Sequence, residues 1–182
     1  MPTFVIKTPR LILRPWRDED HAPYAALNAD PDVRRYWPTT LNREESDAQA
    51  ARLQKHIDEH GFGFWAVEAP SVADFIGFIG LMHAQSDLPF APAVEAGWRL
   101  ARPYWRRGYA TEGALAALAD GFGRLGLQEI VAYAVAINAP SRRVMERIGM
   151  THDPADDYDH KDREPNDPLC RHVVYRKKRD VG

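Results

Sequence analysis

The amino-acid sequence predicts a mixed α/β fold, and three observations support this prediction. Two segments with helix start and stop signals occupy the first third of the chain, short aromatic and β-branched segments fill its centre, and an alanine-rich helix then separates two strands. The 182 residues correspond to about one domain. No linker-like or repeated segment interrupts the sequence, so we expect a single domain over residues 1–182.

In the first third, residues 11–16 alternate as a strand does, and we expect helices over residues 18–29 and 42–60. The first helix stops before Asp30-Pro31, because the residue before a proline avoids helical backbone angles. The second has Asn42 as N-cap with Glu45 three residues later, a capping-box pattern, and stops at Gly61.

In the centre, residues 64–68 and 75–82 predict a hairpin, and residues 94–100 predict a further strand. Glu95, Gly97 and Arg99 alternate with apolar residues there, so the three share one face of the sheet. A helix is expected over residues 107–125, with Leu115 on its apolar stripe. Residues 129–137 are apolar on both faces and predict a buried strand after a crossover, followed by a helix over 140–148 and a last strand over 171–176.

Composition narrows the classes of function. The chain is 45% hydrophobic and 27% charged, as globular proteins are, and its net charge of −2 argues against a broad nucleic-acid-binding surface. The longest apolar run is too short to cross a membrane and the first residues lack a secretory signal, so we expect a cytoplasmic protein without membrane or nucleic-acid partners. The single cysteine, Cys170, excludes a cysteine zinc cluster, and we expect no metal.

The sharpest functional signal lies at the start of the alanine-rich helix. The first amides of a helix have no internal partner and carry partial positive charge, so a glycine turn with two arginines at this point favours a phosphate group. The alternative is an ordinary glycine-turned helix start with solvated arginines. The residues concerned are Arg106, Arg107, Gly108, Tyr109, Ala110 and Thr111.

A second motif, Asn138-Ala139-Pro140-Ser141-Arg142-Arg143-Val144-Met145, follows one strand later. Together the two motifs resemble those of the GNAT acetyltransferases, most closely the branch that includes the ribosomal-protein N-terminal acetyltransferases RimJ and RimL. Further resemblances are Leu-Ile-Leu-Arg at 11–14, Ile-Gly-Phe-Ile-Gly at 76–80, Glu-Ala-Gly-Trp-Arg-Leu at 95–100 and Arg-His-Val-Val-Tyr at 171–175. The resemblance therefore spans nearly the whole chain.

The resemblance implies a fold, a co-substrate and a set of binding residues. The fold is a mostly antiparallel mixed sheet of about seven strands with a splayed parallel pair, flanked by about four helices. The co-substrate is acetyl-CoA, whose pyrophosphate would bind the amides of residues 107–111, beside the Arg106 side chain. Its pantetheine arm would contact backbone groups of Trp98, Arg99 and Leu100 and the side chain of Asn138, with Ser141 beside the thioester sulfur. A homodimer is also plausible from the family.

The chain departs from the family pattern at two positions. Trp105 stands where many members have Gln or Arg, and Met145 stands where other branches have a tyrosine that protonates the leaving thiolate. Because methionine has no proton to donate, Ser141, Tyr109 or water must serve, and we favour Ser141. The alternative role of Ser141 is hydrogen bonding within the first turn of its helix.

The expected reaction is direct attack of a neutral amine on the acetyl thioester, with coenzyme A leaving as thiolate. Glu95 is the candidate general base, acting directly or through water, and a strand amide near Trp98 or Arg99 would stabilise the oxyanion. Alternatively, Glu95 is a solvent-exposed strand residue. A protein α-amine, a polyamine, an amino acid and an aminoglycoside are all consistent acceptors.

Other readings of the sequence stay open. The acidic segment 153–167 with His152 and His160 is consistent with a cation site, a solvated loop, or an acidic wall that attracts a cationic amine. The remaining histidines form no recognisable grouping in the sequence. A protein that binds acyl-CoA without turnover, and an RNA-binding protein that uses the arginine cluster, are the alternative functions.

Overall fold

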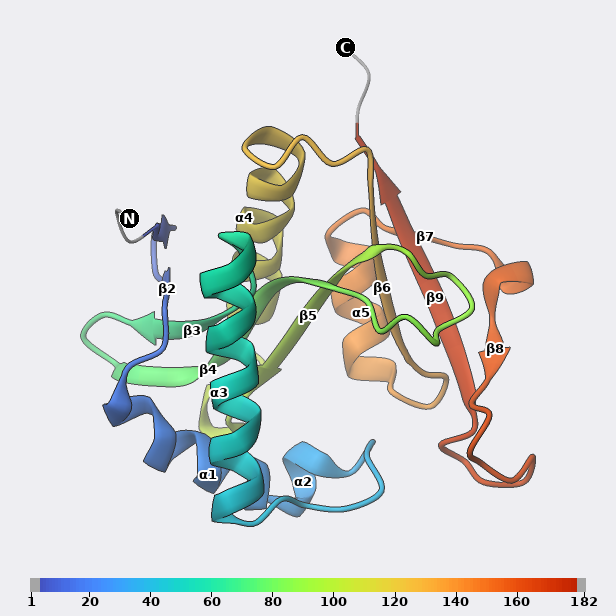
Figure 1. Cartoon of the computed structure of the whole chain (residues 1–182), viewed down its shortest axis with the longest axis horizontal. Helices are drawn as coiled ribbons and strands as arrows, with labels where there is room; N and C mark the ends of the chain where they lie inside the picture. Colours follow the sequence, from blue (N-terminus) through green and yellow to red (C-terminus); the bar gives the residue numbers. More distant parts are fainter. Residues whose placement is uncertain (1–3, 180–182) are drawn as a thin grey trace.

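The computed structural model describes residues 4–179 and contains one nine-stranded mixed sheet with five α-helices (Figure 1). The strands run in the spatial order β1-β2-β3-β4-β5-β6-β9-β7, with β8 also paired to β9. In chain order they are β1 (Ile6–Lys7), β2 (Ile12–Arg14), β3 (Phe64–Ala69), β4 (Ala73–His83), β5 (Val94–Leu100), β6 (Glu129–Val135), β7 (Thr151–His152), β8 (Tyr158–Asp159) and β9 (Arg171–Lys178). The helices are α1 (His21–Ala29), α2 (Pro31–Arg34), α3 (Arg43–His60), α4 (Tyr109–Gly123) and α5 (Ala139–Arg147).

The helices cover both faces of the sheet. Tyr24 of α1 packs edge-on against Phe75 and Phe78 of β4, and α3 contacts both α1 and β3 on the same side. On the opposite face, glycines let α4 approach closely: a Cβ on Gly113 would lie 2.5 Å from the Cδ1 atom of Ile79. Figure 1 shows the two layers, with α3 in front of the sheet and α4 behind it.

The local sequence signals explain the longest helix and the hairpin. The Asn42 side chain accepts a hydrogen bond from the Glu45 amide (2.9 Å), and the Glu45 carboxylate accepts one from the Asn42 amide (2.8 Å). Helix α3 ends at Gly61, which has a φ of 72°. Strands β3 and β4 pair antiparallel as a hairpin. The capping box, the helix end and the hairpin predicted from the sequence are all confirmed.

Strands β5 and β6 are the parallel pair on which the site is built. Strand β5 pairs with β4 along its full length, and β6 pairs with β9 along its full length. Between β5 and β6 a single register pair, Glu95 with Val131, holds the two strands together. The strands therefore diverge toward their carboxyl ends, as the resemblance to the family implies.

The structure differs from the sequence prediction in four places. Strands β1, β7 and β8 have two residues each and are too short to leave an alternating pattern, so the sheet has nine strands rather than about seven. The four-residue helix α2 is an addition, with Asp30 as its N-cap. The helix expected over 18–29 begins with a 3-10 turn, Asp18–Asp20. Leu115, predicted to be buried, is 46% exposed, because the face of α4 on the sheet consists of Gly113, Ala114, Ala117 and Leu118.

Within residues 4–179, the longest α-helices are too polar, and the apolar ones too short, to cross a membrane.

Candidate active site

A cavity of about 950 Å³ opens where β5 and β6 diverge. It runs from the first turn of α4, between the ends of the two strands, to the face covered by α1, α2 and α3. It brings together nearly all the site residues predicted from the sequence: Glu95, Trp98, Arg99, Leu100, Arg106, Gly108, Tyr109, Ala110, Thr111, Asn138 and Ser141. The predicted cofactor residue Arg107 does not line it, and its side chain is exposed to solvent.

One end of the cavity is the N-terminus of α4. Gly108, with a φ of 79°, is the N-cap and makes the tight turn, and Arg106 also has a positive φ of 60°. Glu112 is the first residue whose amide bonds back to this turn, at the Gly108 carbonyl (3.0 Å). The amides of the three preceding residues therefore have no helical acceptor and are free to bind an anion.

Arg10 fixes this turn from outside the cavity. Its guanidinium donates to the Arg107 carbonyl (2.9 Å) and to the Glu112 carboxylate (2.6 Å). Thr8 donates a second hydrogen bond to Glu112 (2.6 Å). These contacts compensate the one acidic side chain in the first turn of α4, so its negative charge does not oppose an anion bound there.

The other wall of the cavity carries the N-terminus of α5. The Asn138 side-chain oxygen accepts a hydrogen bond from the Ser141 amide (3.1 Å), so Asn138 is the N-cap of this helix. Because the Ser141 backbone amide makes this capping hydrogen bond, its hydroxyl can bond to other partners in the cavity. Met145 is 1% exposed and packs in the core.

Glu95 lies at the point where the β5–β6 pairing stops. The sequence left open whether its face meets the cavity, and the structure places it in the lining. Burial raises the pKa of Glu95 to about 7, partly offset by the nearby hydroxyl of Tyr133. Such a carboxylate is strong enough as a base to accept a proton at neutral pH.

Tyr133 is a cavity residue that the sequence analysis missed, because its strand reads as apolar on both faces. It lies two residues after the β5–β6 register pair, and both burial and the Glu95 carboxylate raise the pKa of its phenol. The phenol therefore stays protonated at neutral pH and can donate a hydrogen bond to Glu95.

Arg99 shares the face of Glu95 but lies toward the helices. Its side chain is 9% exposed, and burial lowers its pKa to about 10. Its described partners are neutral: it donates to Asn28 Oδ1 (2.9 Å) and Gln49 Oε1 (3.4 Å), and it lies 4.3 Å from the Trp37 ring centroid. Its Nε atom is buried without a hydrogen-bond partner in residues 4–179. The cavity thus contains a buried cation that no carboxylate of the described chain compensates.

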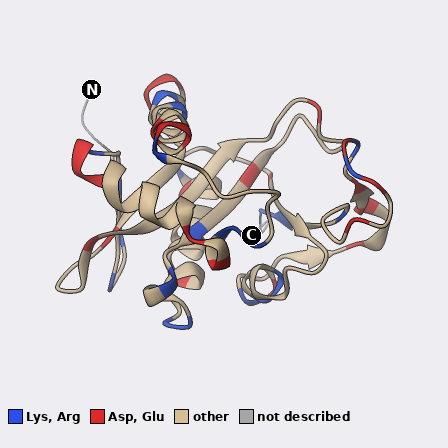
Figure 2. Ribbon diagram, turned by 90° about the horizontal axis from the view of Figure 1, so that it is seen from below, with Lys and Arg blue, Asp and Glu red and all other residues tan. Residues whose placement is uncertain are grey.

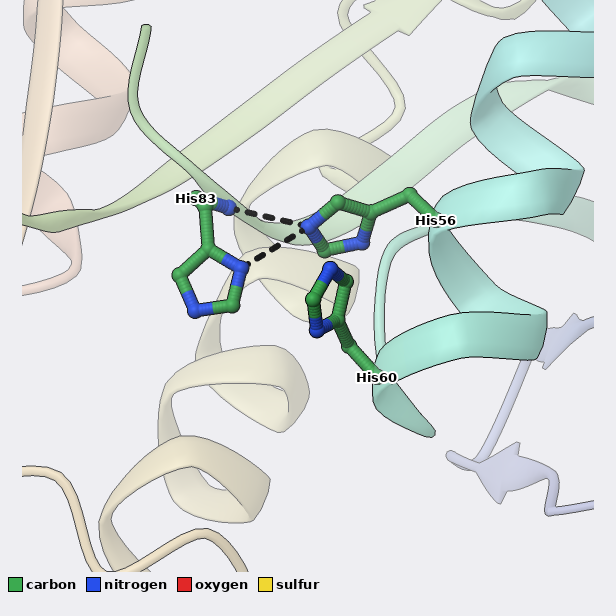
Figure 3. Close-up of side chains that lie close together, drawn as sticks. All are labelled: His56, His60 and His83. Atoms are coloured by element: carbon green, nitrogen blue, oxygen red, sulfur yellow. Dashed lines mark hydrogen bonds between the residues drawn. The ribbon is translucent and has the colours of Figure 1, made fainter. Parts of the chain in front are cut away.

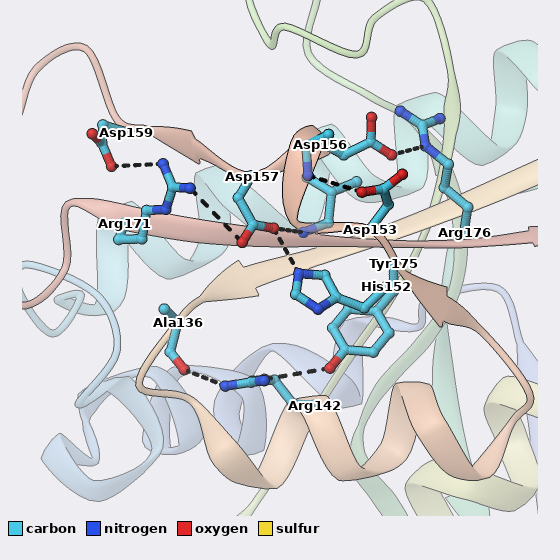
Figure 4. A network of polar contacts seen from close by, with 12 residues as sticks. Ala136, Arg142, His152, Asp153, Asp156, Asp157, Asp159, Arg171, Tyr175 and Arg176 are labelled. Carbon is cyan, nitrogen blue, oxygen red and sulfur yellow. Dashed lines mark hydrogen bonds and ion pairs between the residues drawn. The ribbon is translucent and has the colours of Figure 1, made fainter.

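The acidic segment after α5 borders the cavity through Tyr158, whose ring stacks on that of the cavity residue His172 (5.0 Å), but its carboxylates do not line the cavity. Its interpretation as an acidic wall stays a prediction. Three of its carboxylates are paired beside β9: Asp156 with Arg176 (2.6 Å), Asp157 with His152 (2.8 Å) and Asp159 with Arg171 (3.3 Å), as Figure 4 shows. Acidic and basic residues are interspersed at this end of the molecule (Figure 2). Basic side chains therefore compensate the part of this segment that lies beside β9.

Comparisons with known proteins agree with this geometry. The family model for the acetyltransferase (GNAT) domain matches residues 10–151. The uncharacterized protein YkkB of Bacillus subtilis is 31% identical over 144 residues, which cover 79% of this chain and 83% of YkkB. An acetyltransferase from Agrobacterium tumefaciens is 28% identical, with a TM-score of 0.78 over 98% of this chain and 96% of that one. A GNAT-family acetyltransferase from Bacillus anthracis is 25% identical, with a TM-score of 0.78 over 96% of this chain and 98% of its own. The chain belongs to the GNAT acetyltransferase family.

Proposed function

We propose that this acetyltransferase moves the acetyl group of acetyl-CoA to a primary amine by direct attack in a ternary complex. The observation that carries the proposal is the continuous cavity, which joins an anion-binding helix start to a carboxylate with a pKa of about 7. An N-acetyltransferase needs these two features at opposite ends of one channel, because the pyrophosphate must be held while the amine loses its proton.

Each wall of the cavity has a role in this reaction. The amides of Tyr109, Ala110 and Thr111, with the charge of Arg106 and Arg107 nearby, bind the pyrophosphate. Glu95 removes a proton from the ammonium, and the amine nitrogen then bonds to the thioester carbon. A β5 amide stabilises the oxyanion of the tetrahedral intermediate. As the carbon–sulfur bond breaks, the Ser141 hydroxyl gives its proton to the thiolate and takes the extra proton from the attacking nitrogen, which leaves a neutral amide, the coenzyme A thiol and an unchanged serine.

We further propose that the acceptor carries a carboxylate or phosphate besides its amine. Arg99 supports this assignment, because a guanidinium buried among neutral partners is stabilised by an anion that binds within its reach. Arg35 also lines this end of the cavity, where its guanidinium lies over the rings of Tyr36 (4.9 Å) and Trp105 (5.9 Å). Asp32 lines the same end, but its carboxylate is paired with Arg102 (2.7 Å).

Matched acceptors test this assignment. With an α-amino acid as acceptor, Arg99→Leu raises KM by about 10- to 100-fold, because a hydrogen bond to a charged group contributes about 1.5–3 kcal/mol. With the corresponding amino-acid amide, which lacks the carboxylate, KM changes little. Steady-state thiol release measures both values.

Arg43→Leu is the control for the Arg99 variant, since this exposed arginine pairs with Asp47 (2.7 Å) and neither of these two residues lines the cavity. It leaves both KM values unchanged. An Arg99 variant that weakens the acid and its amide equally would contradict a role in acceptor recognition and indicate a structural one.

The alternative function is an acyl-CoA-binding sensor without turnover, favoured by Met145 in place of a tyrosine. It predicts acetyl-CoA binding with no amine-dependent thiol release. Membership of the RimJ- and RimL-like branch, a cytoplasmic location, a single domain and a homodimer stay predictions from the sequence.

A further inference from the structure

Three histidines meet at the end of the molecule where α3 stops and β4 ends. His56 and His60 lie one turn apart on α3, and His83 is the last residue of β4 (Figure 3). One nitrogen from each ring lies within 4.8 Å of the corresponding nitrogens of the other two. The sequence indicated no grouping of histidines, because the hairpin that brings His83 beside α3 is a tertiary contact. None of the three lines the cavity described above.

Backbone contacts fix the buried member of this cluster in the form that binds metal. The Nδ1 atom of His56 lies 2.9 Å from the Phe62 carbonyl oxygen. Because a carbonyl only accepts hydrogen bonds, Nδ1 carries the proton and Nε2 is the unprotonated nitrogen. In the structure the Nε2 lone pair accepts a long hydrogen bond from the His83 backbone amide (3.3 Å), which a bound ion would replace. Histidines that bind metals commonly show this arrangement, in which the second ring nitrogen donates to a backbone carbonyl.

The spacing of the nitrogens also suits a metal ion. His56 Nε2 lies 3.1 Å from His83 Nδ1. Two imidazole nitrogens bound tetrahedrally to Zn²⁺ at about 2.0–2.1 Å lie about 3.3 Å apart, which is close to this separation. The ring centroids of His60 lie 4.4 Å from His56 and 4.6 Å from His83, and its exposed side chain is free to complete the site by rotation.

The charge around the cluster is compatible with ligation. Arg124, which donates to the Gly61 carbonyl next to the cluster (3.3 Å), is paired with Asp120 (2.6 Å).

We propose that His56, His60 and His83 form a three-histidine site for a divalent transition-metal ion of the Zn²⁺ class, with solvent at the fourth position. Imidazole ligands favour Zn²⁺, Ni²⁺ or Cu²⁺ over Mg²⁺ and Ca²⁺. The ion fastens the C-terminal turn of α3 to the end of β4. It lies outside the acetyl-transfer cavity, so the inference is independent of the proposed function.

Calorimetric titration of the chelator-treated, tag-free full chain with Zn²⁺ tests the site. The wild-type chain binds one equivalent of Zn²⁺, and Co²⁺ in its place gives the visible absorption of a tetrahedral complex. His60→Ala and His83→Ala, which alter the two exposed members, each weaken binding. Removing a residue that only hydrogen-bonds to a metal ligand lowers metal affinity by about 10- to 100-fold. Removing one of the ligands lowers the affinity for Zn²⁺ by at least as much.

His160→Ala is the matched control, since this histidine lies outside the cluster, and it keeps the wild-type affinity. Zn²⁺ also raises the unfolding temperature of the wild type and of the control, but not that of the cluster variants. A wild-type chain that binds neither ion, or a His60→Ala chain that binds Zn²⁺ as tightly as the wild type, would overturn the proposal.

Discussion

Glu95→Gln lowers kcat/KM for the amine by about 100- to 10,000-fold, the range over which a positioned general base contributes to catalysis. The substitution keeps the shape of the side chain at the point where β5 and β6 separate, and removes its ability to accept a proton. The affinity for acetyl-CoA is unchanged, because the phosphate-binding turn of α4 lies at the other end of the cavity. Thiol release at saturating acetyl-CoA, together with calorimetric binding, measures the two quantities.

The pH profile shows whether the carboxylate acts as the base. In the wild type, kcat/KM rises about tenfold per pH unit and levels off above the pKa of Glu95, which burial raises to about 7. Glu95→Gln loses this rise of kcat/KM with pH. A rise that comes from deprotonation of the acceptor ammonium persists in both proteins. A Glu95→Gln variant that retains the rise near pH 7, or that keeps a third of the wild-type rate, contradicts the assignment of Glu95 as the general base.

Stability measurements separate this effect from misfolding. The folded chain holds the Glu95 proton up to a pKa of about 7, whereas the ordinary value is 4.5, so the folded state binds more protons between these values. This contribution therefore decreases as the pH rises from 4.5 to 7, and it is absent from Glu95→Gln. We expect the variant to be at least as stable as the wild type at pH 8.

Asp20→Ala is the substitution with the largest expected effect on stability. Asp20 accepts two hydrogen bonds from the Arg14 guanidinium (2.7 and 2.9 Å), and the two residues are 2% and 3% exposed. Removing the carboxylate leaves a buried cation whose one remaining acidic partner within residues 4–179 is Glu68 (3.1 Å). Breaking a buried pair costs about 3–5 kcal/mol, and the partner that stays places this case near about 3 kcal/mol.

Urea denaturation at pH 7 measures the decrease in the free energy of unfolding of Asp20→Ala. The same loss of stability lowers the unfolding temperature by about 6–12 °C. The control is Asp159→Ala, which removes an exposed pair with Arg171 and changes stability by less than about 1 kcal/mol. Equal stability of the two variants would show that the Arg14–Asp20 pair does not fasten β2 to the turn before α1.

The elements that were predicted correctly are those with strong local signals. The Asn42 capping box, the Gly61 helix end and the β3–β4 hairpin each depend on residues close together in the sequence. The exposed position of Leu115 was not predictable in this way. Helical spacing identifies an apolar stripe, but close approach to the sheet selects glycine and alanine for the contact face.

In the candidate site, too, the features with local sequence signals were predictable and those that depend on tertiary contacts were not. The motif at the start of α4 predicted the turn proposed to bind phosphate, whereas the sequence named Glu95 as a candidate but left open which way it points; the cavity contains both. The missing carboxylate partner of Arg99, the contact of Tyr133 with Glu95 and the histidine cluster all depend on side chains from distant elements. No spacing within a single segment encodes them, since each arises where the hairpin, α3 and the splayed strands pack together.

Thermal unfolding with saturating acetyl-CoA, compared with ATP and NAD at the same concentration, tests the central claim most directly. At about 100 times its dissociation constant a ligand stabilises the folded state by about 2.7 kcal/mol, which shifts the transition of a chain this size by several degrees. We predict a shift with acetyl-CoA and with coenzyme A, and none with ATP or NAD. Equal shifts with all the nucleotides, or none with acetyl-CoA, would contradict an acetyl-CoA site in the cavity between β5 and β6.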